Sequence, residues 1–225
     1  MENCSNPLGN RFRGYLPVIV DIETAGFNPK KNPLLEIAAI IVEADDQGFL
    51  HITEKHQANI IPFKHSELDE AALKFTGIDP YHPFRMAVDE KQALTNLFTP
   101  IKAAVKRNQC KRAILVGHNP AFDLNFLNAA IDRTQYKRSP FHPFSSFDTA
   151  TLGGLAYGQT VLAKVATAAG LEWDNNLAHS ALYDAEQTAK LFCIIVNRWK
   201  RFLDLETDTD NLAPLSCLQI DLAEI

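Results

Sequence analysis

Two acidic residues interrupt a run of β-branched residues near the start of the chain. The segment PVIVDIETAG predicts a buried strand over residues 17–23, because valine and isoleucine dominate it and Gly26 follows. Asp21 and Glu23 are two positions apart, so both side chains face the same side of the predicted sheet. Paired carboxylates on a buried face repel each other and are costly to desolvate unless a cation neutralises them. The alternative is that the strand ends here and the pair points to solvent.

The remaining hydrophobic pattern predicts an α/β fold, with a mixed sheet and helices on its faces. Three consecutive strands joined by short turns predict an antiparallel meander. The expected strands are residues 17–23, residues 34–45, the segment from Gly48 through residue 63, and residues 112–117. The expected helices are residues 67–76, 88–106, 120–133, 148–157, 160–169 and 181–202.

Local details of these helices can also be predicted. Pro120 suits a first helical turn, with Asn119 as the N-cap. Residues 134–146 are expected to form a basic loop that contains proline and phenylalanine. The last helix should bury one face, formed by Leu182, Ala185, Ala189, Phe192, Val196 and Trp199.

Length and charge predict one globular domain over residues 1–203 and an acidic C-terminal tail over residues 204–225. The 225 residues are 46% hydrophobic and 22% charged, which excludes disordered and fibrous classes. The formal net charge is −5, but six acidic and no basic residues follow Arg201. The rest of the chain is therefore close to neutral, and a polyanionic partner is not excluded.

The cysteine pattern and the apolar runs predict a soluble cytoplasmic protein. The four cysteines are scattered without a CxxC pair, so neither a zinc site nor a disulfide framework is expected. The N-terminus does not resemble a signal peptide, and acidic residues interrupt every long apolar run.

Three further polar residues could join the acidic pair. Asp123 falls in the first turn of a predicted helix, where a carboxylate is also favourable without any function. His179 and Asp184 are five residues apart, so they share a site only if His179 lies in a loop before the helix that carries Asp184. His118 is interpreted as structural.

Together these residues indicate a metal-dependent reaction. Asp21, Glu23, Asp123 and Asp184 offer carboxylate oxygens, which suit Mg²⁺ or Mn²⁺ rather than Zn²⁺. Two such ions would balance four negative charges and assist an in-line displacement at phosphorus. Histidine accepts protons near neutral pH, so His179 is the candidate general base. The sequence therefore predicts metal-assisted phosphodiester hydrolysis.

The same residues form three ordered motifs that resemble those of the DEDDh 3′→5′ exonucleases. They are DIE at Asp21 to Glu23, NPAFD at Asn119 to Asp123, and HSALYD at His179 to Asp184. The resemblance implies a ribonuclease H-like fold, with a mixed five-stranded sheet flanked by helices. It also implies two Mg²⁺ ions, which Mn²⁺ can replace, and release of nucleoside 5′-monophosphates. The four carboxylates would bind the metals and His179 would act as the base.

A closer resemblance, over residues 11–201, is to a branch of this family that trims RNA. Segments such as RFRGYLPVIVDIETAGF and KRSPFHPFSSFDTA carry it. It implies a homodimer that trims single-stranded 3′ ends of tRNA and other stable RNAs, with single-stranded DNA as a further substrate. Aromatic rings would stack on the terminal bases, at Phe27, Phe75, Phe122 and Phe144. A basic patch of one subunit would guide RNA into the partner's site, at Arg11, Arg13, Lys106, Arg112 and Lys137.

Several alternatives stay open. Phe75 and Phe122 also suit a helix core, and the basic residues suit an ordinary solvated surface. Where the family has a glutamate four residues before the phenylalanine at Phe75, this chain has Ala71, and neighbouring Glu70 points about 100° away along a helix. Terminal-base preference is therefore open.

Two other functions compete with RNA trimming. One is a proofreading-type 3′→5′ DNA exonuclease, because contacts to the 2′-OH decide between RNA and DNA and no motif reveals them. The other is a non-catalytic RNA-binding module, although a pure binder gains nothing from four carboxylates that repel phosphate. The acidic tail has no counterpart in the family. It is either disordered or a cover over a basic surface.

Overall fold

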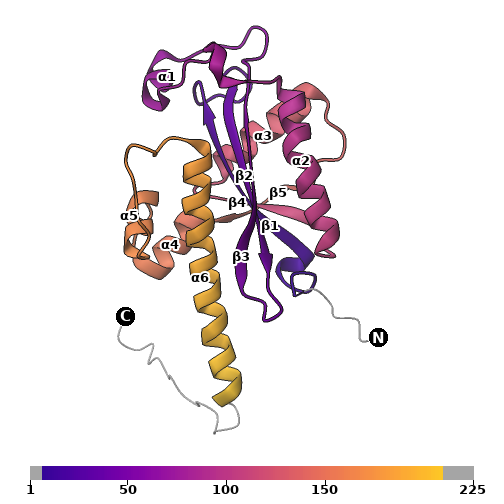
Figure 1. The fold of residues 1–225 in the computed structure, drawn as a ribbon, viewed down its shortest axis with the longest axis vertical. Coiled ribbons are helices and arrows are strands. Elements are labelled where there is room, and N and C mark those ends of the chain that lie inside the picture. Colours follow the sequence, from indigo (N-terminus) through magenta and orange to yellow (C-terminus); the bar gives the residue numbers. More distant parts are fainter. Residues whose placement is uncertain (1–6, 210–225) are drawn as a thin grey trace, which may run out of the picture.

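A five-stranded mixed sheet forms the centre of the molecule, which a computed structural model describes over residues 7–209 (Figure 1). The strand order is β3-β2-β1-β4-β5, with β1, β2 and β3 antiparallel and with β4 and β5 parallel to β1. The strands are β1 (Tyr15–Thr24), β2 (Leu34–Ala44), β3 (Leu50–Asn59), β4 (Arg112–Gly117) and β5 (Phe141–Asp148). The predicted mixed sheet and its antiparallel meander are confirmed.

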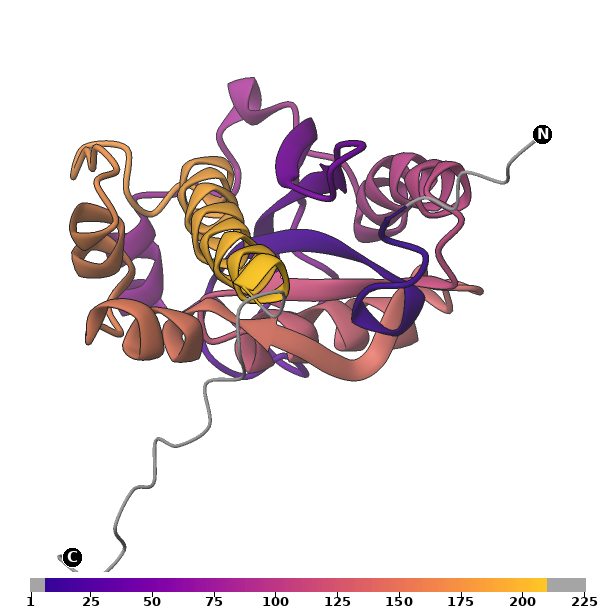
Figure 2. The ribbon, with the colours of Figure 1, turned by 90° about the horizontal axis from the view of Figure 1, so that it is seen from below.

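Helices cover both faces of this sheet. The elements are α1 (Glu70–Thr76), α2 (Glu90–Arg107), α3 (Ala121–Thr134), α4 (Thr149–Tyr157), α5 (Leu162–Ala168) and α6 (Ala181–Thr209), with 3-10 turns η1 (Phe12–Gly14) and η2 (Pro83–Arg85). Helix α6 lies on one side of the sheet and α2 lies on the other side (Figures 1 and 2). Helices α4 and α5 lie beside α6. Within the described residues, no helix is both long and apolar enough to span a membrane.

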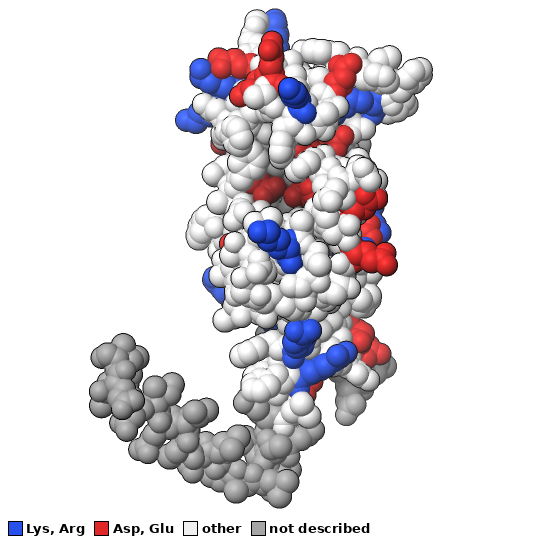
Figure 3. Space-filling model, turned by 90° about the vertical axis from the view of Figure 1, so that its left-hand side faces the viewer, with Lys and Arg blue, Asp and Glu red and all other residues white. Residues whose placement is uncertain are grey.

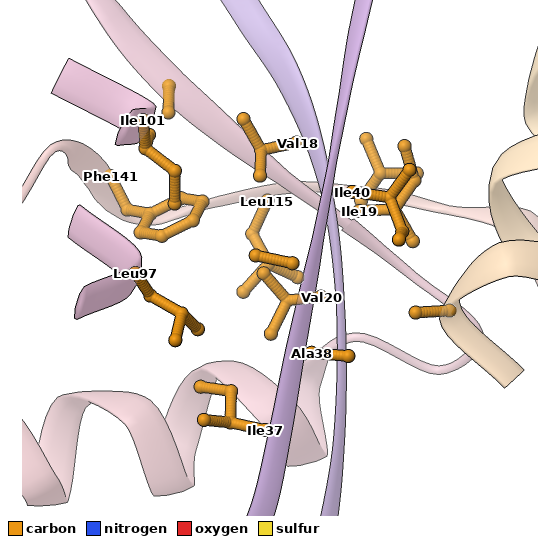
Figure 4. Close-up of a cluster of buried hydrophobic side chains, with 14 of the residues drawn as sticks. Val18, Ile19, Val20, Ile37, Ala38, Ile40, Leu97, Ile101, Leu115 and Phe141 are labelled. Atoms are coloured by element: carbon orange, nitrogen blue, oxygen red, sulfur yellow. The ribbon is translucent and has the colours of Figure 1, made fainter. Parts of the chain in front are cut away.

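The apolar core lies on both sides of β1. Val18 and Val20 point toward Leu97 of α2, whereas Ile19 points to the opposite side, toward α6 (Figure 4). All four side chains are buried, and burying such a side chain contributes about 1.5–3 kcal/mol. Because strand side chains alternate, the odd-numbered positions of β1 after Ile19 continue on the α6 side.

Two predictions about local structure were wrong. The predicted loop over residues 134–146 includes most of β5, which begins at Phe141. Asn119 is not the N-cap of α3: Pro120 holds that position, and Asn119 instead adopts a positive φ of 63° and donates its backbone N–H to Asp148.

The last helix was predicted correctly in its first half. Ala185, Ala189 and Phe192 are buried, and Leu182 and Val196 are partly buried. Trp199, however, is 58% exposed, so its predicted burial is wrong. The reason is that α6 extends past the sheet beyond Asn197, whose amide bonds to Leu50 at the start of β3 (Figure 1).

Helix α6 also continues to Thr209, through the predicted domain boundary at residue 203. The rest of the predicted tail, residues 210–225, lies outside the described residues.

Candidate active site

The acidic pair lies at the carboxyl end of β1. The parallel strands β4 and β5 end at this same edge of the sheet, where α/β proteins commonly place their ligands. Asp21 is half-buried and Glu23 is 8% exposed, and both continue the α6 side of the strand after Ile19. The alternative that the strand emerges into solvent here is therefore excluded for Glu23.

Asp123 reaches the pair from the first turn of α3. A tight turn joins β4 to this helix, and a Cβ atom on Gly117 would approach Pro120 to 3.1 Å, so a larger residue would crowd the turn. Asp123 is 5% exposed, and its carboxylate accepts the backbone N–H of Ile22, which lies between Asp21 and Glu23. The first turn of α3 is thereby fixed against β1.

His179 and Asp184 meet at the start of α6. His179 lies in the turn before the helix, with a φ of 67°, and its backbone N–H donates to Asp184 Oδ2 at 3.1 Å. One ligand atom each from Glu23, His179 and Asp184 lies within 4.8 Å of the others. A loop histidine before a helical aspartate is the arrangement that the sequence predicts.

The carboxylates lie near enough to disturb one another's ionisation. Burial, followed by the charges of Asp123, Asp184 and Glu23, raises the pKa of Asp21 well above its usual range. Burial and the charge of Asp184 raise the pKa of Glu23 to about 8. Burial also raises the pKa of Asp123 to about 8, against the effect of the backbone N–H groups that bond it. Such repulsion is typical of a site that is completed by cations.

Asp184 gives a direct test of whether a cation fits. Its Oδ1 atom is buried and has no hydrogen-bond partner among the described residues, while Oδ2 accepts the N–H of His179. A buried carboxylate oxygen without a partner is unfavourable. The donor set beside it, from Asp21, Glu23 and Asp123, consists of carboxylates, which suit hard cations such as Mg²⁺ or Mn²⁺. The residues therefore fit a divalent metal site.

The surface shows a hollow with acidic groups at its base. Figure 3 looks onto the side on which α1, α4 and α5 lie. Acidic atoms are recessed in this hollow, between the level of α1 and the level of α4 and α5, and the surface immediately around them is mostly uncharged (Figure 3). A ligand can therefore reach the carboxylates from this side.

Two exposed phenylalanines contact residues of the acidic centre or their neighbours. Phe27 is 82% exposed, and its ring lies 6.1 Å from that of Phe122, which precedes Asp123. Phe75 is 66% exposed, and its ring lies 4.3 Å from that of His179. This exposure excludes the core alternative for Phe75, whereas Phe122 does pack partly against the core.

Phe144 is the fourth predicted aromatic residue, and it lies on the edge strand β5. It is 78% exposed, and the ring contact given for it is with His142, at 4.5 Å. It therefore has no ring contact with the other three phenylalanines within the described part of the chain.

The predicted basic residues lie near the amino ends of the parallel strands, whereas the acidic pair lies at the carboxyl end of β1. Arg13 precedes β1, Arg112 begins β4, Lys137 precedes β5, and Lys106 is in the last turn of α2. All four are exposed, whereas Arg11 is half-buried and donates to the Gly48 carbonyl oxygen. The fold thus separates these residues from the acidic centre of the same chain.

Asp148 is a supporting residue that the sequence analysis missed. Its carboxylate accepts the backbone N–H groups of Asn119 and Ala150 and the hydroxyl of Thr151, so it caps α4 and holds the turn before α3. Asp148 is the first residue of the helix predicted over residues 148–157, and an aspartate at that position is an N-cap signal that could have found it. His118 bonds Thr149 and the Thr160 carbonyl oxygen, as a structural residue would.

Comparison with known proteins identifies the family. Residues 18–192 match the sequence profile of the RNase_T exonuclease family. The chain belongs to this exonuclease family. A ribonuclease T from Marinobacter nauticus is 57% identical over 195 residues, which cover 87% of this chain and 88% of the relative. This member of the exonuclease family is therefore a hydrolase.

Solved structures of exonucleases share the fold. Escherichia coli exonuclease I, in complex with a dT13 oligonucleotide, superposes with a TM-score of 0.64 at 19% identity, over 87% of this chain. The match spans 44% of exonuclease I, so the chain corresponds to less than half of that protein. The nuclease domain of 3′hExo, a DEDDh family member bound to rAMP, gives a TM-score of 0.65 at 20% identity, over 81% of this chain and 92% of that domain. The predicted ribonuclease H-like fold is thereby confirmed.

Proposed function

We propose that this exonuclease is a Mg²⁺-dependent 3′→5′ exoribonuclease that trims single-stranded 3′ ends of tRNA and other stable RNAs. The observation that carries the proposal is the group of mutually repelling carboxylates beside His179, in a chain 57% identical to a ribonuclease T. The proposed location is the cytoplasm, which agrees with the scattered cysteines.

In this proposal Asp21, Glu23, Asp123 and Asp184 hold two Mg²⁺ ions, which Mn²⁺ can replace. When bound, the ions would help to ionise the attacking water and stabilise the leaving oxygen. His179 is exposed, and its ring lies within reach of the same site, so it can take the proton of the attacking water. Hydrolysis at the last phosphodiester then releases a nucleoside 5′-monophosphate.

The exposed phenylalanines would bind the terminal bases. Phe27 and Phe75 present free ring faces beside the acidic centre, and Phe122 supports Phe27 from α3. Stacking needs only a ring face and contributes about 1–3 kcal/mol per base, so it suits substrates of varied sequence. Phe144 would contact the RNA strand at a point farther from the acidic centre, because it lies on β5.

The position of the basic residues supports a homodimer. Four carboxylates repel phosphate, so attraction for RNA must come from another surface. Arg13, Lys106, Arg112 and Lys137 lie at the opposite edge of the sheet, and surface charges are screened beyond about 8–10 Å. In the proposed dimer these residues guide RNA into the partner's acidic site, and Arg11, which bonds Gly48, contributes least.

A labelled RNA tests the proposal. We expect a 5′-labelled stem-loop RNA with a single-stranded 3′ overhang to shorten from its 3′ end with Mg²⁺, to stop near the stem, and to stay intact with EDTA. Asp21→Asn should abolish the shortening, and Asn96→Ala, on the exposed side of α2, is the matched control. Cleavage of a matched DNA overhang alone would indicate a proofreading-type exonuclease. Binding of both without cleavage would indicate a non-catalytic module.

A further inference from the structure

Phe27 and Phe75 stand on two separate segments of the chain. Phe27 lies in the loop after β1 and Phe75 lies on the short helix α1. Both rings are mostly exposed, so packing in the core does not fix their positions. The spacing between them depends on how the backbones of the two segments are joined.

The side-chain amide of Asn32 joins these segments. Its Oδ1 atom accepts the backbone N–H of Asn28 at 2.9 Å, and its Nδ2 donates to the Glu67 carbonyl oxygen at 2.8 Å. The amide lies directly over Gly26, where a Cβ atom would approach it to 2.5 Å. Asn32 therefore contacts the residue before Phe27 and bonds the segment that leads into α1.

Backbone hydrogen bonds extend this connection. The N–H of Glu67 donates to the Lys31 carbonyl oxygen at 2.8 Å, and the N–H of Asp69 donates to the Ala25 carbonyl oxygen at 3.0 Å. Asp69 is also the N-cap of α1, because its carboxylate accepts the N–H of Ala71. The loop and the start of α1 therefore form one hydrogen-bonded unit.

Arg133 connects this unit to the catalytic part of the molecule. It donates to the Pro29 carbonyl oxygen at 3.1 Å, and two of its nitrogens bond the Glu90 carboxylate at 2.8 and 2.6 Å. Its guanidinium lies 3.9 Å from the centroid of the Phe63 ring. Since Arg133 belongs to α3, the loop is tied to the helix whose first turn carries Asp123.

We propose that Asn32 is a positioning residue for substrate binding, which holds the loop of Phe27 against α1 so that Phe27 and Phe75 keep a fixed spacing for the terminal bases. The inference rests on the proposed function, because it assigns base stacking to these rings. Asn32 touches neither the substrate nor the acidic centre in this scheme. It acts through the loop, so its loss should weaken RNA binding and leave the hydrolytic step intact.

The test is a comparison of Asn32→Ala with Phe27→Ala and with the double variant. Loss of one stacked base corresponds to roughly 5- to 150-fold in affinity, so we expect Asn32→Ala to raise KM for a short oligoadenylate about tenfold, with kcat nearly unchanged. The single-turnover rate of RNA cleavage at saturating enzyme, which does not depend on affinity, should stay at the wild-type value. In the Phe27→Ala background, Asn32→Ala should have little further effect.

Two other variants make the comparison specific. Asn32→Asp keeps the acceptor for Asn28 but loses the donor to Glu67, so its KM should also rise. Asn96→Ala removes an exposed side-chain hydrogen bond with Gln92 on α2 and should leave KM unchanged.

Each result bears on a defined claim. A wild-type KM in Asn32→Ala, or effects of the two single variants that multiply in the double variant, would overturn the positioning role. Failure of the wild-type protein to shorten RNA would instead contradict the proposed function. A fall in the single-turnover rate at saturating enzyme together with a lower melting temperature would assign Asn32 a general structural role and reject the inference.

Discussion

Glu23 illustrates how a single residue can make the free energy of unfolding depend on pH. Its native pKa is about 8, whereas a glutamate in the unfolded chain titrates near 4.5. Between these values the native protein holds a proton that the unfolded chain has released. Unfolding therefore releases protons over this range, and the free energy of unfolding falls as the pH rises. The raised pKa values of Asp21 and Asp123 act in the same direction.

Metal should reverse this pH dependence. In EDTA, we expect the free energy of unfolding to decrease from about pH 5 to about pH 8. Mg²⁺ favours the ionised carboxylates, so the stability gained on adding it should grow with pH. Urea denaturation at several pH values, with Mg²⁺ and with EDTA, measures both effects. An equal gain from Mg²⁺ at all pH values would argue against a carboxylate site, and Asp21→Asn with Asp123→Asn should show a flatter pH profile than the wild type.

The proposed general-base role of His179 can be tested separately from its effect on stability. Its φ of 67° is unfavourable for most residues, but asparagine tolerates it, so His179→Asn is the appropriate variant. We expect kcat on RNA to fall about 10²- to 10⁴-fold, because proton transfer by a side chain contributes about that much. The melting temperature should hardly change, since the His179 ring is exposed and its N–H to Asp184 is retained. Single-turnover cleavage and thermal melting measure the two outcomes, and a wild-type kcat would exclude His179 as the base.

At the scale of elements, α6 lies close to the sheet through its alanines. Ala181, Ala185 and Ala189 are four residues apart and fully buried, so one face of the helix approaches the strands closely. Asp184 lies on the same first turns, and its position depends on this packing. The helix that supplies the last carboxylate is thus placed by the absence of large side chains.

Enlarging one of these alanines should disturb stability and activity together. Ala185→Leu is expected to lower the free energy of unfolding by about 1–3 kcal/mol, as overpacked core positions do. It should also lower the rate on RNA, because α6 and Asp184 would move away from β1. Ala103→Leu, on the exposed side of α2, is the matched control and should change neither quantity. Urea denaturation and initial cleavage rates measure the effects, and full activity in a destabilised Ala185→Leu protein would contradict the packing argument.

The elements that could be predicted from sequence are those with a strong local pattern. The β-branched run of β1 and the amphipathic first half of α6 were both found. Strand β5 was missed because Pro143 and His142 break its alternation, and proline is tolerated on an edge strand that the sequence alone does not identify. Burial of Trp199 was predicted wrongly, since helical periodicity does not reveal where a helix leaves the sheet.

The grouping of the acidic residues could also be predicted, because three ordered motifs carry them. The supporting contacts could not. Asp148, Asn32 and Arg133 act through backbone atoms of residues distant in sequence, and such contacts leave no pattern in a single chain. The grouping of the basic residues likewise follows from the parallel direction of β1, β4 and β5, which brings their amino ends together, and not from any motif.

At the scale of the whole molecule, the acidic and basic groups occupy opposite edges of one sheet. Arg13→Ala combined with Lys137→Ala is expected to weaken RNA binding and to reduce the slope of log affinity against log salt by about 1.4, since each lost contact to a single strand contributes about 0.7. Lys64→Ala combined with Lys91→Ala removes the same charge near the start of α2 and should leave the slope unchanged. Filter binding at several salt concentrations, with an Asp21→Asn background to prevent cleavage, measures it. An unchanged slope in the first pair would identify these residues as ordinary surface charges.

The placement of Arg13 and Lys137 also affects how the activity of the proposed dimer would depend on the concentration of the enzyme. Under the proposed function, a lone subunit would keep the proposed catalytic residues and yet attract RNA poorly, because the exposed basic residues lie at the opposite ends of the strands from the acidic centre. RNA degradation in a cell would then depend on how often two subunits meet, so output would rise more steeply than the number of chains. If the proposed dimer forms, such a nuclease would cut little RNA while it is scarce and would become effective once enough copies have accumulated.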